Sequence, residues 1–192
     1  MKTLLKHLRA GQVYRRKHLT KYSSDLNREL QALTQSGDLK KIAGGVYYKP
    51  RYSKYGELPP DDEKLITAIL NTKNFLAFAP ADLNSMGLGS TQLPNVIRVY
   101  NTKRRGRLKI AGRTYDFRIR DGFPQELTPE FLFVEFLNEY RDMAEEVTLS
   151  RERIARALKG LKVKRVRSLL KRFGKIHARK IYRTLYEQQH SI

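Results

Sequence analysis

The spacing of apolar residues divides the first fifty residues into short helices and strands. Leu26, Leu30 and Leu33 recur at i, i+4 and i+7, which predicts one buried stripe on a helix over residues 23–36. Ser23 or Ser24 would cap this helix. The other predicted elements are a helix over residues 2–9, an extended piece at 13–14, a helix over 15–21 and short strands at 39–42 and 46–48.

This order of helix, strand, helix, helix and hairpin is typical of a winged helix-turn-helix. The helix over 23–36 would be the recognition helix, and the hairpin around Gly44 and Gly45 would be the wing. Residues 51–60 contain the Ser, Gly and Pro that are common in linkers. We therefore expect a winged helix-turn-helix domain over residues 1–50, followed by a linker over 51–60.

Residues 61–127 predict a small α+β domain. Its helix would start at Asp61, Asp62 and Glu63, whose negative charges suit a helix N-terminus, and would bury residues 65, 66, 69 and 70. The other expected elements are strands at 75–78, 96–100, 107–110 and 115–119, a helical turn at 82–86, and a turn at Gly112-Arg113 between the last two strands.

Residues 128–192 predict a helical C-terminal region. Thr128-Pro129 marks a helix start, because proline is well tolerated at the first helical position. Apolar residues at helical spacing follow: Phe131, Val134 and Leu137, then Ile154, Leu158 and Leu161, then Val163, Val166, Leu170 and Phe173, then Ile176, Tyr182 and Leu185. The expected fold class of the whole chain is α+β.

The charge of the chain is concentrated at its two ends. The 192 residues include 39 Lys+Arg and 19 Asp+Glu, for a net charge of +20 and a pI of about 10.3. Residues 1–50 carry 11 basic and 3 acidic side chains and residues 151–192 carry 14 and 2, whereas the segment between them is neutral. Phosphate binding explains such a division, because each neutralised phosphate releases counterions. The expected partner is therefore double-stranded DNA.

Composition excludes several other classes of protein. The absence of cysteine excludes a disulfide scaffold, a thiol nucleophile and a Cys-ligated zinc site. The longest uncharged apolar run, residues 75–81, is too short to span a membrane, so we expect a cytoplasmic protein without a membrane partner. The four histidines are not spaced as metal ligands and no phosphate-binding glycine loop is present, so we expect no catalytic residue, no metal and no cofactor.

The candidate DNA-binding residues fall into three groups. Ser24, Asn27, Arg28 and Gln31 lie on the outer side of the recognition helix, with Ser23 at its start, and Arg, Asn and Gln are the side chains that read guanine and adenine. Arg15, Arg16 and Lys17 precede this helix and suit phosphate contacts. Lys40, Lys41, Tyr47 and Lys49 belong to the wing, where one of the adjacent Tyr47 and Tyr48 should be buried.

Several short motifs resemble the AbiEi-type antitoxins, which are type IV toxin–antitoxin regulators. The motifs lie at residues 14–19, 26–30, 37–42 and 45–50, and then at 81–88, 91–92, 94, 99–101 and 104–117. The resemblance implies a repressor that binds an inverted-repeat operator, regulates its own operon and opposes a nucleotidyltransferase-like toxin. It also implies that Asn27, Arg28 and the run from Arg15 to Lys17 face DNA.

Two alternatives remain open at this stage. The basic C-terminal helices could instead bind RNA or the ribosome. The chain could also be a nucleic-acid-processing enzyme that uses Asp61, Asp82 or Asp116 with Mg²⁺. On DNA, either a dimer or two monomers could occupy the paired repeats.

Overall fold

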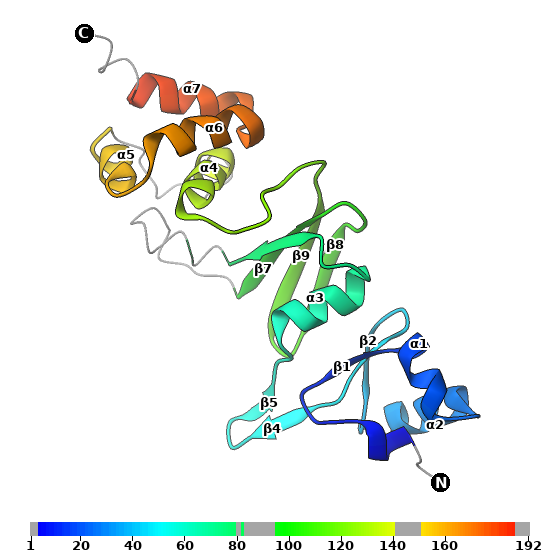
Figure 1. Cartoon of the computed structure of the whole chain (residues 1–192). Coiled ribbons are helices and arrows are strands. Elements are labelled where there is room, and N and C mark those ends of the chain that lie inside the picture. The colour runs from blue at the N-terminus through cyan, green and yellow to red at the C-terminus, as the bar shows by residue number, and fades with distance from the viewer. Residues whose placement is uncertain (1–3, 80–81, 83–94, 141–150, 187–192) are drawn as a thin grey trace. The chain divides into compact units, whose positions relative to one another are not determined.

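The structure of the chain is a computed structural model that describes residues 4–79, 82, 95–140 and 151–186 (Figure 1). The described elements mix helices and strands throughout, which confirms the α+β class. The chain forms two compact units, residues 1–74 with 103–116 and residues 75–102 with 117–192. This division cuts across the segment 61–127 that the sequence pattern treats as one domain.

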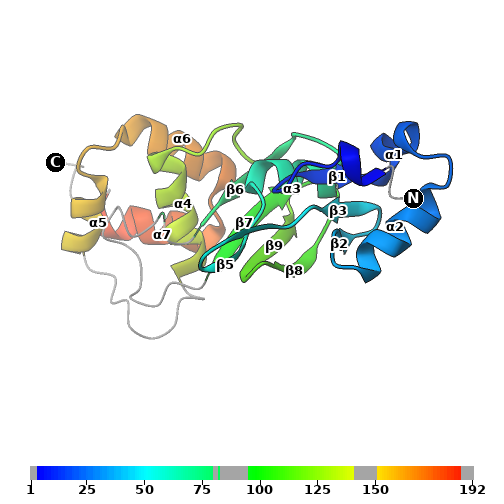
Figure 2. The ribbon, with the colours of Figure 1, turned by 90° about the horizontal axis from the view of Figure 1, so that it is seen from below.

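The first unit starts with short helices and a small sheet. Its elements are η1 (Leu4–His7), β1 (Val13–Arg15), α1 (Arg16–Leu19), η2 (Thr20–Tyr22), α2 (Leu26–Gln35), β2 (Lys40–Ala43) and β3 (Val46–Tyr48). The strands form an antiparallel sheet in the order β1-β3-β2, and Figure 2 shows β3 between the other two. The predicted elements are therefore confirmed, apart from shifts of a few residues at their ends.

Apolar burial holds α2 against the rest of this unit. Leu30 and Leu33 on α2 are buried together with Leu4, Leu19 and Leu39, which come from the segments before and after it. Each fully buried leucine stabilises the fold by about 1.5–3 kcal/mol. The burial is one-sided because the apolar stripe covers only one face of the helix, so its other face remains exposed.

The start of α2 differs from the expectation. Asp25, rather than Ser23 or Ser24, occupies the position before the first helical residue, and it makes no side-chain capping hydrogen bond. The Oγ of Ser23 instead donates to Oε1 of Glu29 at 2.7 Å. The expected serine cap is thus replaced by a side-chain bond between the preceding loop and the first turn of α2.

Residues 51–60 form a hairpin and not an irregular linker. The strands β4 (Arg51–Ser53) and β5 (Gly56–Leu58) pair antiparallel across a tight turn. Gly56 adopts a φ of 112°, which glycine tolerates better than other residues. The linker interpretation did not anticipate these strands, because tight turns and linkers are rich in the same small and polar residues.

The next elements are α3 (Asp62–Leu70), β6 (Phe75–Phe78), β7 (Val96–Asn101), β8 (Gly106–Ile110) and β9 (Arg113–Ile119). The last four strands form a sheet in the order β6-β7-β9-β8. As expected, the carboxylate-rich start of α3 caps the helix, since Asp61 accepts a hydrogen bond from the backbone N–H of Lys64. The helical turn expected at 82–86 lies outside the described residues except for Asp82.

The second unit contains the C-terminal helices α4 (Pro129–Glu139), α5 (Arg151–Leu158), α6 (Val163–Phe173) and α7 (Ile176–Leu185). Thr128 caps α4 and Pro129 is its first residue, as expected. Residues 130–139 of α4 are all buried, so the prediction of a single apolar face was too narrow. Helices α6 and α7 both pack on α4, and Figure 1 shows α6 beside it. Ile176, one of the apolar residues that mark this last helix in the sequence, is 87% exposed at the first position of α7.

Candidate nucleic-acid interface

The outer face of α2 carries the side chains that the sequence assigns to base recognition. Asn27, Arg28 and Gln31 are exposed, and Ser24 is exposed just before the helix. These polar side chains lie on the face of α2 opposite its buried leucines. The helical repeat therefore places the leucines in the core and the polar side chains in solvent. Their amide and guanidinium groups can donate hydrogen bonds to the edges of bases.

The acidic residue of this helix turns away from that face. Glu29 is half-buried and accepts hydrogen bonds from the backbone N–H of Leu4 at 2.8 Å and from Ser23 at 2.7 Å. Its carboxylate therefore ties η1 and the preceding loop to α2. Ser23, a candidate DNA contact, is engaged in this structural bond.

The basic run before α2 divides between two roles. Arg16 is exposed, and its Nη2 donates to Oδ1 of Asn27 at 2.8 Å, so two candidate residues from α1 and α2 lie together. Lys17 is exposed on α1. Arg15 is half-buried, and its Nη1 donates to the carbonyl of Ala68 on α3 at 2.9 Å. Arg15 therefore links elements of the first unit.

The strands around Gly44 and Gly45 hold the remaining candidates. Lys40 and Lys41 are exposed on β2, and Lys40 pairs with Glu57, an interaction that raises the pKa of the lysine. Lys49 lies 3.8 Å from the carboxylate of Asp38. Of these lysines, Lys41 is the one for which the structure gives no acidic partner.

Both tyrosines of β3 are buried, whereas one was expected to be exposed. Tyr47 joins the leucine cluster around α2, and the hydroxyl of Tyr48 donates to the carbonyl of Leu58 on β5. Burial also raises the pKa of Tyr48. The expectation failed because the face of β3 that carries Tyr48 is covered by the β4–β5 hairpin, which supplies the carbonyl of Leu58 as a hydrogen-bond acceptor. Tyr47 is 8% exposed, so its side chain offers little surface to a ligand.

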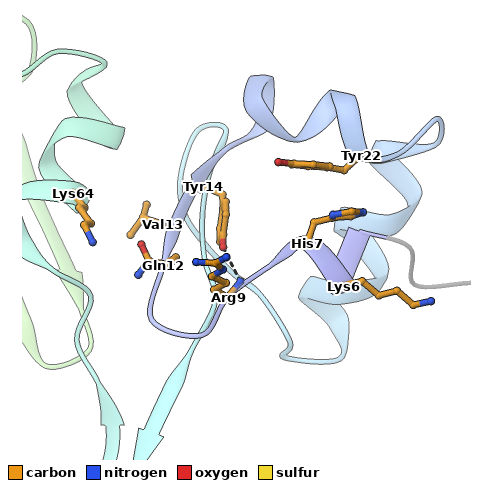
Figure 3. Close-up of a pocket in the computed structure, with 8 residues that line it drawn as sticks. All are labelled: Lys6, His7, Arg9, Gln12, Val13, Tyr14, Tyr22 and Lys64. Atoms are coloured by element: carbon orange, nitrogen blue, oxygen red, sulfur yellow. Dashed lines mark hydrogen bonds between the residues drawn. The ribbon is translucent and has the colours of Figure 1, made fainter.

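A basic cavity of about 670 Å³ lies on the first unit (Figure 3). Its lining consists of Lys6, His7, Arg9, Gln12, Val13, Tyr14, Tyr22 and Lys64. The rings of His7 and Tyr22 stack with their centroids 4.4 Å apart, and the hydroxyl of Tyr14 accepts from the backbone N–H of Arg9. Three cations and no carboxylate line the cavity, which suits an anion. Sequence reasoning missed this cluster because Lys64 lies far along the chain from Lys6 and Arg9, so no local pattern relates them.

The carboxylates considered for an enzyme have structural partners at separate places. Asp61 caps α3, while Asp62 accepts from Arg113 at 2.8 Å and from the hydroxyl of Tyr115. Asp116 lies 3.5 Å from Arg107, and Asp82 accepts from the backbone N–H of Ala79. Among the residues that the structure describes, no group of three or more His, Cys, Asp or Glu side chains is arranged to hold a metal ion.

The fold and this surface define a mixed α+β protein whose N-terminal unit exposes a polar and basic helix face. By sequence the chain belongs to the DUF6088 family, described as a family of unknown function, whose profile matches residues 1–130. A search of the curated proteins finds no match. None of the helices in the described part of the chain combines the length and the hydrophobicity that crossing a membrane requires.

Proposed function

We propose that residues 1–50 form a winged helix-turn-helix and that the protein is a sequence-specific DNA-binding repressor. The observation that carries this proposal is the exposed face of α2, with Asn27, Arg28 and Gln31, on a helix whose opposite face is fixed by buried leucines. In a winged helix, the second helix of the pair enters the major groove. The element order and the sheet order β1-β3-β2 support this assignment.

The side chains suit the two tasks of a DNA interface. Arg28 and Gln31 lie one turn apart and supply donors for guanine and adenine edges. Arg16, Lys17 and Lys41 supply positive charge on either side of α2 in the chain and suit phosphate contacts, which position a protein without reading sequence. Arg16, a candidate for phosphate contact, donates a hydrogen bond to Asn27, a candidate for base contact, and this bond orients the Asn27 side chain.

The test starts with selection of bound duplexes from a random pool, followed by affinity measurements on the selected duplex and on a scrambled one. Arg28→Ala should cost about 1–3 kcal/mol on the selected duplex, which is about 5- to 150-fold, and should reduce the preference over the scrambled duplex. Lys41→Ala is the matched control, since it removes one exposed cation and should weaken both duplexes alike. Equal losses for Arg28→Ala on both duplexes would contradict the recognition role of α2.

A narrower proposal follows from the resemblance to AbiEi-type antitoxins: the repressor binds an inverted-repeat operator, regulates its own operon and opposes a nucleotidyltransferase-like toxin. Expression of the adjacent reading frame tests the last part. If that product arrests growth, co-expression of this chain should restore growth. Unrelieved arrest, or an adjacent product without any effect, would contradict the antitoxin role and leave DNA recognition to be judged by the selection experiment.

A further inference from the structure

We propose that the groove between α6 and α7 is a second nucleic-acid site, which binds the phosphate backbone of duplex DNA. The groove has a volume of about 270 Å³ and is lined by Arg167, Leu170, Lys171, Arg179, Tyr182 and Arg183. Four of these six side chains are cations, and none is an anion. The site lies in the second unit and does not require α2 to read bases.

Helical spacing brings the cations into one row on each helix. Arg167 and Lys171 are one turn apart on α6, and Arg179 and Arg183 are one turn apart on α7. The two helices follow each other after only Gly174 and Lys175, so the end of α6 lies beside the start of α7. Residues of both rows line the same groove.

Arg179 has a structural role in addition to its charge. Its Nε donates to the carbonyls of Leu170 at 3.2 Å and Gly174 at 2.9 Å, which ties the first turn of α7 to the last turn of α6. The bonds fix the position of this guanidinium within the groove.

Acidic residues do not neutralise this surface from within the helices. The sequence from residue 153 to residue 186 contains 13 Lys+Arg and no Asp or Glu. Two acids of α4 approach cations that lie outside the groove lining: Glu130 is 3.9 Å from Arg165, and Glu139 is 3.9 Å from Lys175. The groove lining therefore gathers four cations with no acidic residue among them, a composition that suits an external anion.

The extent of the row favours a polyanion over a single phosphate. Exposed Lys164 precedes Arg167 and Lys171 on the same side of α6, so this row runs from residue 164 to residue 171, a rise of about 10 Å at 1.5 Å per residue. Duplex DNA carries one negative charge per about 1.7 Å of its axis.

The test compares two triple variants of the full chain. Arg167→Gln, Lys171→Gln and Arg183→Gln together remove groove charge and leave the structural bonds of Arg179 intact. Arg156→Gln, Lys159→Gln and Lys162→Gln together remove the same charge from exposed positions outside the groove. Affinity for a short duplex of random sequence is measured by fluorescence anisotropy between about 50 and 200 mM salt, the range in which phosphate contacts dominate.

We expect the groove variant to lower the slope of log affinity against log salt by up to about 2.7, at about 0.9 for each of three lost phosphate contacts. The control variant should lower it by much less. An unchanged slope, or equal reductions in the two variants, would overturn the proposal.

Failure of this proposal can be told apart from failure of the proposed repressor function. The groove variant should keep the preference for a selected duplex over a scrambled one, because α2 is unaltered. If the protein shows no sequence preference at all but the groove variant still lowers the salt slope, recognition by α2 is wrong and the groove assignment stands.

Discussion

Truncation of Glu135 should strongly destabilise the second unit. This carboxylate is 1% exposed on α4, and it accepts hydrogen bonds from the hydroxyl of Tyr100, from Arg120 at 2.7 Å and from Asn138 at 3.0 Å. Arg120 also donates to the carbonyl of Phe173 at 2.8 Å. Glu135→Ala therefore removes the acceptor at the centre of a buried network and leaves a guanidinium without its counter-charge.

The expected loss follows from the burial of the pair. Breaking a buried ion pair by removing one partner costs about 3–5 kcal/mol, because the other charge stays buried without compensation. The side chain of Arg120 retains 21% exposure and its bond to Phe173, so the lower end, about 3 kcal/mol, applies. Glu135→Gln keeps acceptor capacity without the charge and should lose less. Since domains are stable by about 5–15 kcal/mol, the alanine variant should unfold at clearly lower denaturant concentration.

Urea unfolding followed by circular dichroism measures the change. Glu126→Ala, an exposed position before α4, is the control and should stay within about 0.5 kcal/mol of the parent. Glu135→Leu with Arg120→Met removes both charges and should recover most of the stability lost in Glu135→Ala. Equal effects of Glu135→Ala and Glu126→Ala would refute the reasoning that this network holds α4 in place.

Three further changes test other parts of the fold. Glu29→Ala should destabilise the first unit by about 1–3 kcal/mol in urea unfolding, because the N–H of Leu4 and the hydroxyl of Ser23 lose their acceptor. Gly45→Ala should cost about 1 kcal/mol by the same assay because its φ is 67°, whereas Gly44→Ala, where φ is not positive, should not. Backbone hydrogen bonds hold the pKa of Glu130 below 4.5 despite opposing burial, so Glu130→Gln should destabilise at neutral pH and the difference should vanish as the pH falls through the lowered pKa. A constant difference down to acid pH would contradict that last expectation.

Local periodicity accounts for the elements that the sequence predicted well. The leucine stripe of α2 and the Thr128-Pro129 start of α4 are each a pattern within one helix, so a short stretch of sequence contains the whole signal. The β4–β5 hairpin was missed because its short strands, without a clear apolar alternation, resemble a linker. The burial of both Tyr47 and Tyr48 was missed for a related reason, since the partner of Tyr48 lies on β5.

Candidate contacts were predicted with less success where a distant partner decides the orientation of a side chain. Arg16 is exposed as expected for a surface cation, whereas Arg15 turns to a carbonyl on α3, 53 residues away in sequence. The hydroxyl of Ser23 donates to Glu29, six residues further along the chain, and the spacing of apolar residues does not predict this bond. The sequence identified the exposed face of α2 because burial of leucines fixes that face locally.

The positive charge of the C-terminal helices is larger than their packing requires. The acids of α4 are engaged by particular cations, since Glu135 accepts from Arg120 and Glu139 lies 3.0 Å from Arg98 and 3.2 Å from Arg118. The cations that line the α6–α7 groove have no acidic residue in that lining. Like-charge pairs one turn apart destabilise a helix by about 0.2–0.5 kcal/mol each. An anion bound along the groove would relieve the repulsion between these cations, and that relief would add to its affinity. The placement of these charges in one groove therefore indicates a ligand more than their number does.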